Sequence, residues 1–517
     1  MRGGQSHFRY AKIGTVPKPF SSALSAFYNI AMPYHSLAEF LEKLAEAGEL
    51  ARVEAAVDPT LEIAEITGRV ASSGGPALLF SVVEGRRFPV LTNLLGTESR
   101  ICRALEVESL REVAERIAGL VHPSDPEGWF EKILSGPARA ALRRLVARPV
   151  RSGACQQVVR LGGDIDLGDL PVLRACLGEP GPTITAGMLV AADAASGRAH
   201  VGRYDLRPLD RDRMAACWHP HEEPARLLAG YAERRSKMPV AVVLGGDPAE
   251  LLAAMAPLPP GADVAAVAGL LRNKPVDVVK CRSIELEVPA DAEFVVEGTI
   301  DPAEPPVEFG WVAGPGGHYC AGPPSPVIRV TAMTHRTNPI YPALVRGRHA
   351  HEEIAIGRAL HRVFRPLVEL AIPELADYDL PAFGAARHWG FVAIRKDHAG
   401  QARRVAQAVW GLRPLMFTKF LVIVDEEVDV RDAEQVWSAV AAHADPRSDV
   451  FFGEGPADPW DPATAPGTLG CRMAIDATAK LPGERAAERL GPAAASEEVR
   501  RRVSERWPQY GLGAEGP

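Results

Sequence analysis

The sequence predicts a mixed α/β and β protein with an N-terminal α/β domain, a central domain built mainly of strands, and a C-terminal α/β domain. Helical and strand periods of apolar residues alternate at both ends of the chain. In the middle, short strands are separated by turns rich in Gly, Pro and Asp, which suggests a barrel. The length of 517 residues is enough for two to four domains at about 100–200 residues each.

The first domain is predicted at residues 36–150, after an extension at 1–35 that we expect to be disordered. Ser36 and Glu39 have the spacing of a capping box, and LAEFLEKLAEAGEL repeats its apolar residues at the helical period. The other predicted elements are a strand at ARVEAAV, a helix at about 60–72, strands at PALLFSVV and FPVLTNLL, and helices with loops over 109–145.

The central domain is predicted at residues 151–335, after a segment rich in Gly and in turns flanked by Pro. Two helical pieces, at 221–235 and 248–256, interrupt its strands. The predicted strands lie in TITAGMLVAAD, HVGRYDLRPL, PVAVVLGG, DVVKCRSIELEVPA, FVVEGTI and VIRVTAMTHR.

The C-terminal α/β domain is predicted at residues 336–485, followed by a helix and tail at 486–517. Its helices and strands alternate through EEIAIGRALHRVFRPLVELA, GFVAIRKD, AGQARRVAQAVWGL, KFLVIVDEEVDV and DAEQVWSAVAAHA. The last helix, at about 484–507, carries alternating Glu and Arg. It is long enough to dock on another subunit, although a solvated helix explains the same pattern.

Composition argues against several classes of function. The formal net charge is −7, whereas a protein whose main partner is nucleic acid needs a basic stripe. We expect no membrane span, because no run of about 18 apolar residues occurs, and no secretory signal. The seven cysteines are an odd number without a Cys-x-x-Cys pair, so we expect a reducing cytoplasm, without a disulfide framework or a zinc–thiolate site.

Histidine pairs are the first candidates for a site, because the usual nucleotide, hydrolase and zinc-protease motifs are absent from the sequence. They are His219 and His221 in CWHPHEEP and His349 and His351 in GRHAHEE, with His200 in AHVGRYD as a further candidate. On a strand, His-x-His directs both rings to one face, which suits a metal ion. The alternative is that these histidines are solvated surface residues.

The segment DAEFVVEGTIDPAEPPVEFGWVAGPGG at 291–317 is the second candidate. It is either a plain hairpin or an active-site loop. Glu308 lies between apolar neighbours, which can raise a carboxyl pKa and suit a general acid, but a carboxylate on a loop rim has the same sequence. Glu352 and Glu353 open a predicted helix, where the helix dipole stabilises them.

Four stretches resemble the UbiD-like decarboxylases, which use prenylated FMN. They occur in the family's order from about residue 36 to 485. The first is FLEKLAEAGELARVEAAVDPTLEIAEI with GGPALLFSVVEGRRFPVLTNLLGT, and the second is AGLLRNKPVDVVKCRSIELEVPADAEFVVEGTID. The third is NPIYPALVRGR, and the fourth is VWGLRPLMFTKFLVIVDEEVDVRDAEQVWSAVAAHADPRSDV, closing with GCRMAIDATAKLPGE.

The resemblance implies an N-terminal α/β domain, a split β-barrel that holds the flavin, and a C-terminal α/β domain whose last helix helps to form a homo-oligomer, a dimer or a hexamer. It implies removal, or reversible addition, of CO2 at an unsaturated or aromatic carboxylic acid. The cofactor does the difficult chemistry and the protein orients the substrate. A flavin prenyltransferase is the implied supplier of the cofactor.

The family's catalytic Arg–Glu–Glu/Asp triad is altered in this sequence. Asp205 stands at the position of the Arg, and Glu308 matches the first acid. Trp311 stands at the position of the second acid, which is normally the proton donor, and an indole there can stack on the substrate or narrow the pocket. Arg203 or Arg207 could replace the missing Arg, although strand alternation places both on the same face as Asp205.

The family's metal ligands, which are Asn, His and Glu, are altered too. His200 stands at the Asn position, His221 matches the His, and Val264 stands at the Glu position with Asp263 beside it. His200, His221 and Asp263 are therefore the predicted ligands of Mn2+ or a similar divalent ion, and K+ is a second candidate ion. Loss of the metal site is the alternative.

The remaining assignments concern the cofactor and the proton donor. Gly202 and Arg203, next to His200 in sequence, are expected to contact the flavin, and Lys419 in MFTKF matches a family lysine near the cofactor. After Glu308, the next candidates for the proton donor are His351 and His349, which stand where many relatives have prolines.

Three hypotheses follow from these departures. The chain is a prenylated-FMN decarboxylase with an atypical proton donor, or an altered subunit that works only inside a larger carboxylase complex or on an activated substrate. The third hypothesis is a non-catalytic scaffold or flavin carrier. A purified protein that has no activity but still forms oligomers would favour the scaffold. Partner proteins that co-purify with the chain would favour the complex subunit.

Overall fold

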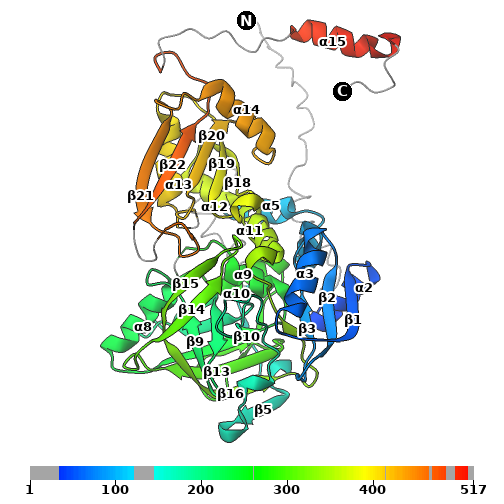
Figure 1. Cartoon of the computed structure of the whole chain (residues 1–517), viewed down its shortest axis with the longest axis vertical. Coiled ribbons are helices and arrows are strands. Elements are labelled where there is room, and N and C mark those ends of the chain that lie inside the picture. The colour runs from blue at the N-terminus through cyan, green and yellow to red at the C-terminus, as the bar shows by residue number, and fades with distance from the viewer. Residues whose placement is uncertain are drawn as a thin grey trace, which may run out of the picture.

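The computed structural model describes residues 34–121, 145–259, 261–413, 415–464, 469–484 and 495–510. Most of the predicted N-terminal extension at 1–35 lies outside the described residues, as does part of the predicted tail at 486–517. Figure 1 shows the N-terminal elements beside the central strands and the C-terminal layer above both.

The N-terminal elements form a small mixed sheet covered by helices. Ser36 caps the first helix through its Oγ, which accepts from the amide of Glu39 at 3.3 Å, as the capping spacing predicts. The sheet order is β1-β2-β3-β17, so its last strand, β17 (Tyr341–Pro342), comes from far along the chain. The other elements are α2 (Leu37–Glu46), β1 (Leu50–Val57), α3 (Glu62–Ser72), β2 (Ala77–Val83), β3 (Val90–Thr92), α4 (Glu98–Ala104) and α5 (Leu110–Val121).

The centre is a curled sheet of eight strands, in the order β7-β6-β10-β13-β16-β9-β8 with β5 paired to β16. Its two edge strands, β7 and β8, follow one another in sequence with only Tyr204 between them. The sheet therefore curls far enough for the end of β7 to lie next to the start of β8, as in a half-barrel. The strands are β5 (Val158–Leu161), β6 (Met188–Ala192), β7 (Ala199–Arg203), β8 (Asp205–Pro208), β9 (Arg213–Cys217), β10 (Met238–Leu244), β13 (Phe294–Ile300) and β16 (Val327–His335).

Helices, a small sheet and a hairpin surround the half-barrel. The helices are α8 (Glu223–Glu233), α9 (Pro248–Met255) and α10 (Val264–Arg272). The small sheet has β4 (Arg148–Pro149), β11 (Asp277–Lys280) and β12 (Glu287–Pro289), and the hairpin has β14 (Val307–Ala313) and β15 (Tyr319–Ser325). The sequence predicted the first two helices and missed α10, which Asp263 caps by accepting from the amide of Ala266 at 3.1 Å.

The C-terminal layer is a five-stranded sheet in the order β18-β19-β20-β22-β21, with β19, β20 and β22 parallel. Its elements are α11 (His351–Val363), α12 (Arg365–Ala371), β18 (Leu375–Asp379), β19 (Trp389–Ile394), α13 (Gln401–Gly411), β20 (Phe420–Asp425), α14 (Ala433–His443), β21 (Val450–Pro456) and β22 (Leu469–Asp476). The predicted terminal helix is described only as α15 (Glu497–Arg506), and none of its residues is buried. Short 3-10 turns lie at 154–156, 162–164, 167–169, 347–349, 382–384 and 507–510.

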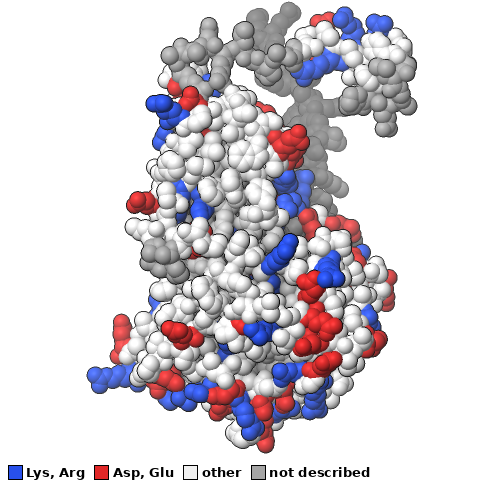
Figure 2. Space-filling model, viewed as in Figure 1, with Lys and Arg blue, Asp and Glu red and all other residues white. Residues whose placement is uncertain are grey.

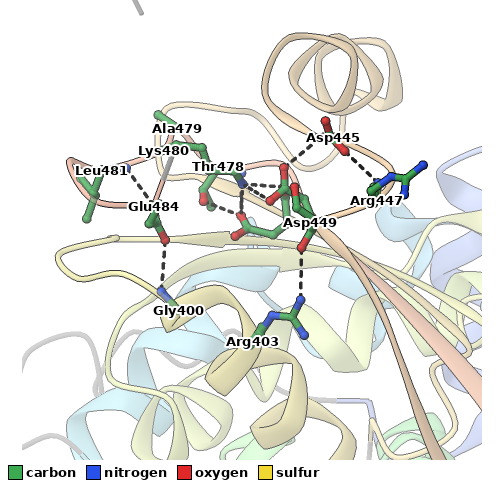
Figure 3. A network of polar contacts seen from close by, with 12 residues as sticks. Gly400, Arg403, Asp445, Arg447, Asp449, Thr478, Ala479, Lys480, Leu481 and Glu484 are labelled. Carbon is green, nitrogen blue, oxygen red and sulfur yellow. Dashed lines mark hydrogen bonds and ion pairs between the residues drawn. The ribbon is translucent and has the colours of Figure 1, made fainter. Parts of the chain in front are cut away.

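Polar contacts fasten the chain after β22 to the rest of this layer. The Glu484 carboxylate accepts from the amides of Leu481 at 2.8 Å and Gly400 at 3.1 Å (Figure 3). The nearly buried Lys396 ammonium reaches the same carboxylate at 2.6 Å. The turn before β21 is held by Asp449, which accepts from the amide of Asp445 at 2.7 Å.

In Figure 2, charged side chains of both signs intermingle along the lower part and the right side of this face, whereas its middle is mostly uncharged. That distribution fits the small net charge and shows no basic stripe on this face. Among the described residues, no helix is long and apolar enough to cross a membrane.

Candidate functional site

A cavity of about 380 Å3 lies where edge strand β7, the start of α8 and the α9–α10 connection face the C-terminal layer. Gly202 lines it, and a Cβ at that position would lie 2.7 Å from the Tyr204 ring and 3.1 Å from His200 Nε2, so only glycine fits between the two rings. The polar side chains on its wall belong to His200, Arg203, Tyr204, His221, Glu222, Glu223, Glu353, His361, Arg387 and Arg413.

Four charged side chains form a closed ring of ion pairs at this wall, which we call the charge ring. Asp205 accepts from Arg203 at 2.6 Å and from Arg346 at 2.9 Å. Glu353 lies 3.1 Å from Arg203 and 3.0 Å from Arg346, which closes the ring. The side chains of Arg203 and Glu353 are 12% and 14% exposed, whereas Arg346 and Asp205 are 1% and 2% exposed. The ring therefore presents one cation and one carboxylate to the cavity and buries the other pair.

Arg346 explains how a carboxylate is tolerated at position 205. Burial favours the neutral guanidine, but Asp205 and Glu353 hold the pKa of Arg346 above its usual value. Arg346 and Arg203 therefore compensate the negative charge of Asp205. Two buried Arg346 nitrogens, Nε and Nη2, make no hydrogen bond among the described residues, although Nε lies 3.0 Å from the Glu353 carboxylate.

Arg207 follows Arg203 and Asp205 along the chain in β8, but it does not join the charge ring. Its guanidinium stacks 4.1 Å over the ring of Phe309 and donates to the backbone oxygen of Trp311 at 3.4 Å. Burial lowers the pKa of Arg207. This residue ties the half-barrel to hairpin β14–β15.

His200 and His221 both line the cavity. His200 Nε2 lies 3.1 Å from the Tyr204 hydroxyl, and burial lowers the pKa of His200 to about 4. The His221 ring stacks on His219 at 5.7 Å and packs against Phe417 at 5.4 Å, and burial lowers its pKa too. Both imidazoles are therefore neutral near pH 7 and keep a nitrogen lone pair for a ligand.

Asp263 does not gather with these histidines. Its carboxylate caps α10, and Val264 beside it is apolar and lines the cavity. Over the described ranges, no group of three or more His, Cys, Asp or Glu side chains is arranged to hold a metal ion. The residues present therefore do not fit the predicted three-ligand metal site.

The segment at 291–317 forms strand β13 followed by the hairpin β14–β15, so the plain-hairpin alternative describes its backbone. Glu308 is exposed and has no hydrogen bond or ion pair among the described residues, and neither it nor Trp311 lines the cavity. The Trp311 side chain is 55% exposed, while Phe309 between them is buried. The proposed catalytic roles of Glu308 and Trp311 stay predictions.

The residues that open α11 have different surroundings. His351 is partly buried and does not line the cavity. Burial is the main cause that lowers the pKa of His351, and the charge of His349 lowers it further. The fully buried Glu352 accepts from the amide of Leu95 at 2.7 Å and joins α11 to the N-terminal domain. Glu353, one residue on, faces the cavity and belongs to the charge ring. From the sequence, this residue was explained only by the helix dipole, and that position was not predicted.

Of two further charged residues in the C-terminal layer, Arg387 lines the cavity and Lys419 does not. Arg387 lines it and pairs with the buried Asp458, which also accepts from His388 at 2.9 Å. Burial opposes ionisation of Asp458, but Arg387 and His388 hold its pKa well below the usual range. Lys419 does not line the cavity and pairs with Asp461 at 2.9 Å, so its predicted contact with the cofactor stays a prediction.

Sequence reasoning missed Arg346, Arg387 and Arg413. Arg346 belongs to the stretch NPIYPALVRGR, which carried part of the resemblance, so a buried role could have been suspected there. Arg413 likewise lies in the resembling stretch VWGLRPLMFTKF, whereas nothing near Arg387 in the sequence distinguishes it from a surface arginine.

Comparison with known proteins gives the class of this protein. Three family models match: the 3-octaprenyl-4-hydroxybenzoate carboxy-lyase N-terminal domain at residues 41–117, the Rift-related domain at 148–349 and the C-terminal domain at 354–477. An uncharacterized protein of Aquifex aeolicus is 37% identical over 483 residues, which cover 93% of this chain and 99% of that protein.

Two solved enzymes share the fold over most of their length. The UbiD-class enzyme HmfF from Pelotomaculum thermopropionicum, in complex with FMN, is 31% identical with a TM-score of 0.72, covering 89% of this chain and 98% of HmfF. Vanillic acid decarboxylase from Sedimentibacter hydroxybenzoicus, in its closed form, is 26% identical with a TM-score of 0.79, covering 92% of this chain and 100% of that chain. This chain belongs to the UbiD family of carboxy-lyases, whose structures have the same mixed α/β fold and curled sheet.

Proposed function

We propose that this chain is a prenylated-FMN-dependent carboxy-lyase that removes, or reversibly adds, CO2 at an unsaturated or aromatic carboxylic acid. The observation that carries the proposal is the cavity beside β7, where the charge ring presents Arg203 and Glu353 next to His200, Gly202 and His221. The resemblance assigned Gly202 and Arg203 to the flavin and His200 and His221 to the cofactor's metal site. HmfF has been solved with FMN and, in an evolved dimeric form, with prFMN.

The composition of the cavity wall supports binding of a flavin nucleotide, since the wall combines aromatic and aliphatic side chains with several basic groups. When bound, the modified flavin would supply the electron sink for loss of CO2. We derive no step through Mn2+ or K+, because the predicted metal ligands do not gather. The implied cellular partner is a flavin prenyltransferase, which would supply the cofactor.

Arg203 is positioned to orient the substrate carboxylate, because it lines the cavity and its guanidinium is held on two sides by Asp205 and Glu353. A substrate held by Arg203 would therefore lie within reach of Glu353, whose carboxyl is 3.1 Å from the Arg203 guanidinium. Glu353 would then give its proton to the carbon that has lost CO2, and its carboxylate would regain a proton from water. This assigns to Glu353 the task that an acid on the loop performs in the family.

The first test is co-expression with a flavin prenyltransferase, followed by absorbance spectroscopy and mass analysis of the released cofactor. We expect prenylated FMN in the purified protein and CO2 release from unsaturated or aromatic acids. Purified protein that contains no flavin under these conditions would overturn the proposal and favour the non-catalytic scaffold.

Two isosteric variants separate the candidate proton donors. We expect Glu353→Gln to bind the cofactor but to lose CO2 release by about 100-fold or more, because general acids contribute on the order of 100- to 10,000-fold. Glu308→Gln is the matched control and should retain turnover, since Glu308 is exposed outside the cavity. Loss of turnover in Glu308→Gln with normal turnover in Glu353→Gln would restore Glu308 as the donor.

A subunit of a larger complex is the second candidate. One solved form of the Sedimentibacter enzyme contains a truncated second component, ShVdcD. If this chain also needs a partner, an affinity-tagged chain will bring down one stoichiometric protein, and the isolated chain will bind the cofactor without turnover. Turnover by the isolated chain would exclude this reading.

A further inference from the structure

Almost every ionised side chain on the cavity wall has a partner. Glu223 pairs with Arg226, and the half-buried Glu222 accepts from the amide of His219 at 2.6 Å. Arg387 is neutralised by Asp458. Arg203 and Glu353 belong to the charge ring. The acids in the cavity are therefore already engaged and leave little free negative charge for a cation.

Arg413 is the exception. It lines the cavity, yet among the described residues it has no hydrogen bond and no ion pair. It follows α13 in a segment that also contributes Phe417, whose ring packs on His221. Arg413, His200 and His221 all line this cavity. A guanidinium without a partner among the described residues and two imidazoles on the same cavity wall are hydrogen-bond donors for an anion.

The same arrangement disfavours a divalent cation. Two imidazoles remain of the predicted metal ligands, because Asp263 caps α10. A guanidinium in the same region repels a metal ion, whereas it attracts a phosphate.

We propose that Arg413, His200 and His221 hold the phosphate of the flavin directly, without a divalent ion between protein and phosphate. The inference rests on the proposed function, because it assigns the phosphate end of the same flavin. It makes cofactor binding in this chain independent of metal.

The test compares FMN with riboflavin, which lacks the phosphate, on full-length protein stripped of metal with EDTA. Quenching of flavin fluorescence gives both dissociation constants, with and without added Mn2+. We expect FMN to bind roughly 10- to 100-fold more tightly than riboflavin, as expected for charge-assisted hydrogen bonds. Mn2+ should change the FMN dissociation constant by less than about twofold, and the preference for FMN should fall as salt is raised.

Arg413→Gln should weaken FMN binding by roughly 10-fold or more and leave riboflavin binding unchanged. Arg52→Gln is the matched control, since Arg52 is exposed on β1 and away from the cavity. If Arg413→Gln does not fold, the metal and salt dependence of the unmodified protein decides alone.

Three results would overturn the inference. FMN binding that requires Mn2+, or an Arg413→Gln variant that keeps the full preference for FMN, would remove the direct phosphate contact and leave the proposed function intact. Failure to bind either flavin under every condition would remove both the inference and the proposed function.

Discussion

At the scale of single residues, Arg346 and Asp205 form a compensated pair. An acid in the position of the family's arginine would be an uncompensated buried charge, and such a charge is costly. Arg346 removes that cost with a contact at 2.9 Å and stacks 4.8 Å over the Trp460 ring. Whether a buried acid is tolerated therefore depends on the charged side chains that contact it in the folded protein, not on its position in the sequence alone.

Arg346→Gln tests this compensation. We expect a loss of about 3–5 kcal/mol in the free energy of unfolding, because Asp205 and Glu353 would lose a shared buried partner. Urea unfolding followed by circular dichroism measures the change. Combining Arg346→Gln with Asp205→Asn should recover part of the loss, whereas equal stability of Arg346→Gln and the unmodified protein would show that the charge ring is not formed.

Glu352 makes the stability depend on pH. Burial raises its pKa to about 7, against the opposing effects of the Leu95 amide and Arg100. The folded chain therefore holds a proton that the unfolded chain releases above about pH 4.5. The contribution of Glu352 to stability is present at low pH and is lost as the pH rises through about 7.

Glu352→Gln should flatten this dependence. Between pH 5 and 8 the unmodified protein should lose up to about 3 kcal/mol more than the variant, since one pKa unit corresponds to about 1.4 kcal/mol. Urea unfolding across that range measures the difference, with the exposed Glu46→Gln as the control. A variant as pH-dependent as its parent would show that Glu352 is ionised throughout.

At the scale of secondary-structure elements, the junction of β7 and β8 places the site. Because a single residue joins the two edge strands of the curled sheet, Arg203 and Asp205 lie at the point where the sheet closes. The cavity opens beside this point, and α10 closes one side of it through Val264.

Asp263 is a helix cap in this arrangement, and that role can be separated from metal binding. We expect Asp263→Ala to lose about 1 kcal/mol of stability, the usual cost of removing an N-cap, and Asp263→Asn to lose much less. Neither variant should change FMN affinity or metal content, which fluorescence titration and elemental analysis measure. Loss of a bound divalent ion in Asp263→Asn would show that Asp263 is a metal ligand.

At the scale of the whole molecule, α11 and the C-terminal layer complete the cavity. Helix α11 packs on α5, α3, α4 and α9, so it joins the N-terminal helices to the half-barrel. It also carries Glu352 toward the N-terminal domain and Glu353 toward the cavity. Of these two consecutive residues of α11, Glu352 thus contributes to stability and Glu353 to the proposed chemistry.

Removal of residues 495–517 tests the predicted role of the terminal helix. Because α15 buries none of its residues, its removal should leave the thermal midpoint of the folded chain unchanged. If the helix joins subunits, light scattering should report a smaller assembly for the truncated chain. An unchanged mass would show that the subunits associate elsewhere.

The sequence by itself determined the local elements and the family. The Ser36 cap, most strands and helices and the four resembling stretches depend on short-range patterns, which periodicity and motif spacing reveal. Tertiary structure alone decided the charge ring, since Arg346 and Asp205 are 141 residues apart. It also decided that Asp263 caps a helix and that Arg413 has no hydrogen bond or ion pair within the described part of the chain, because such contacts depend on distances that only the folded chain sets.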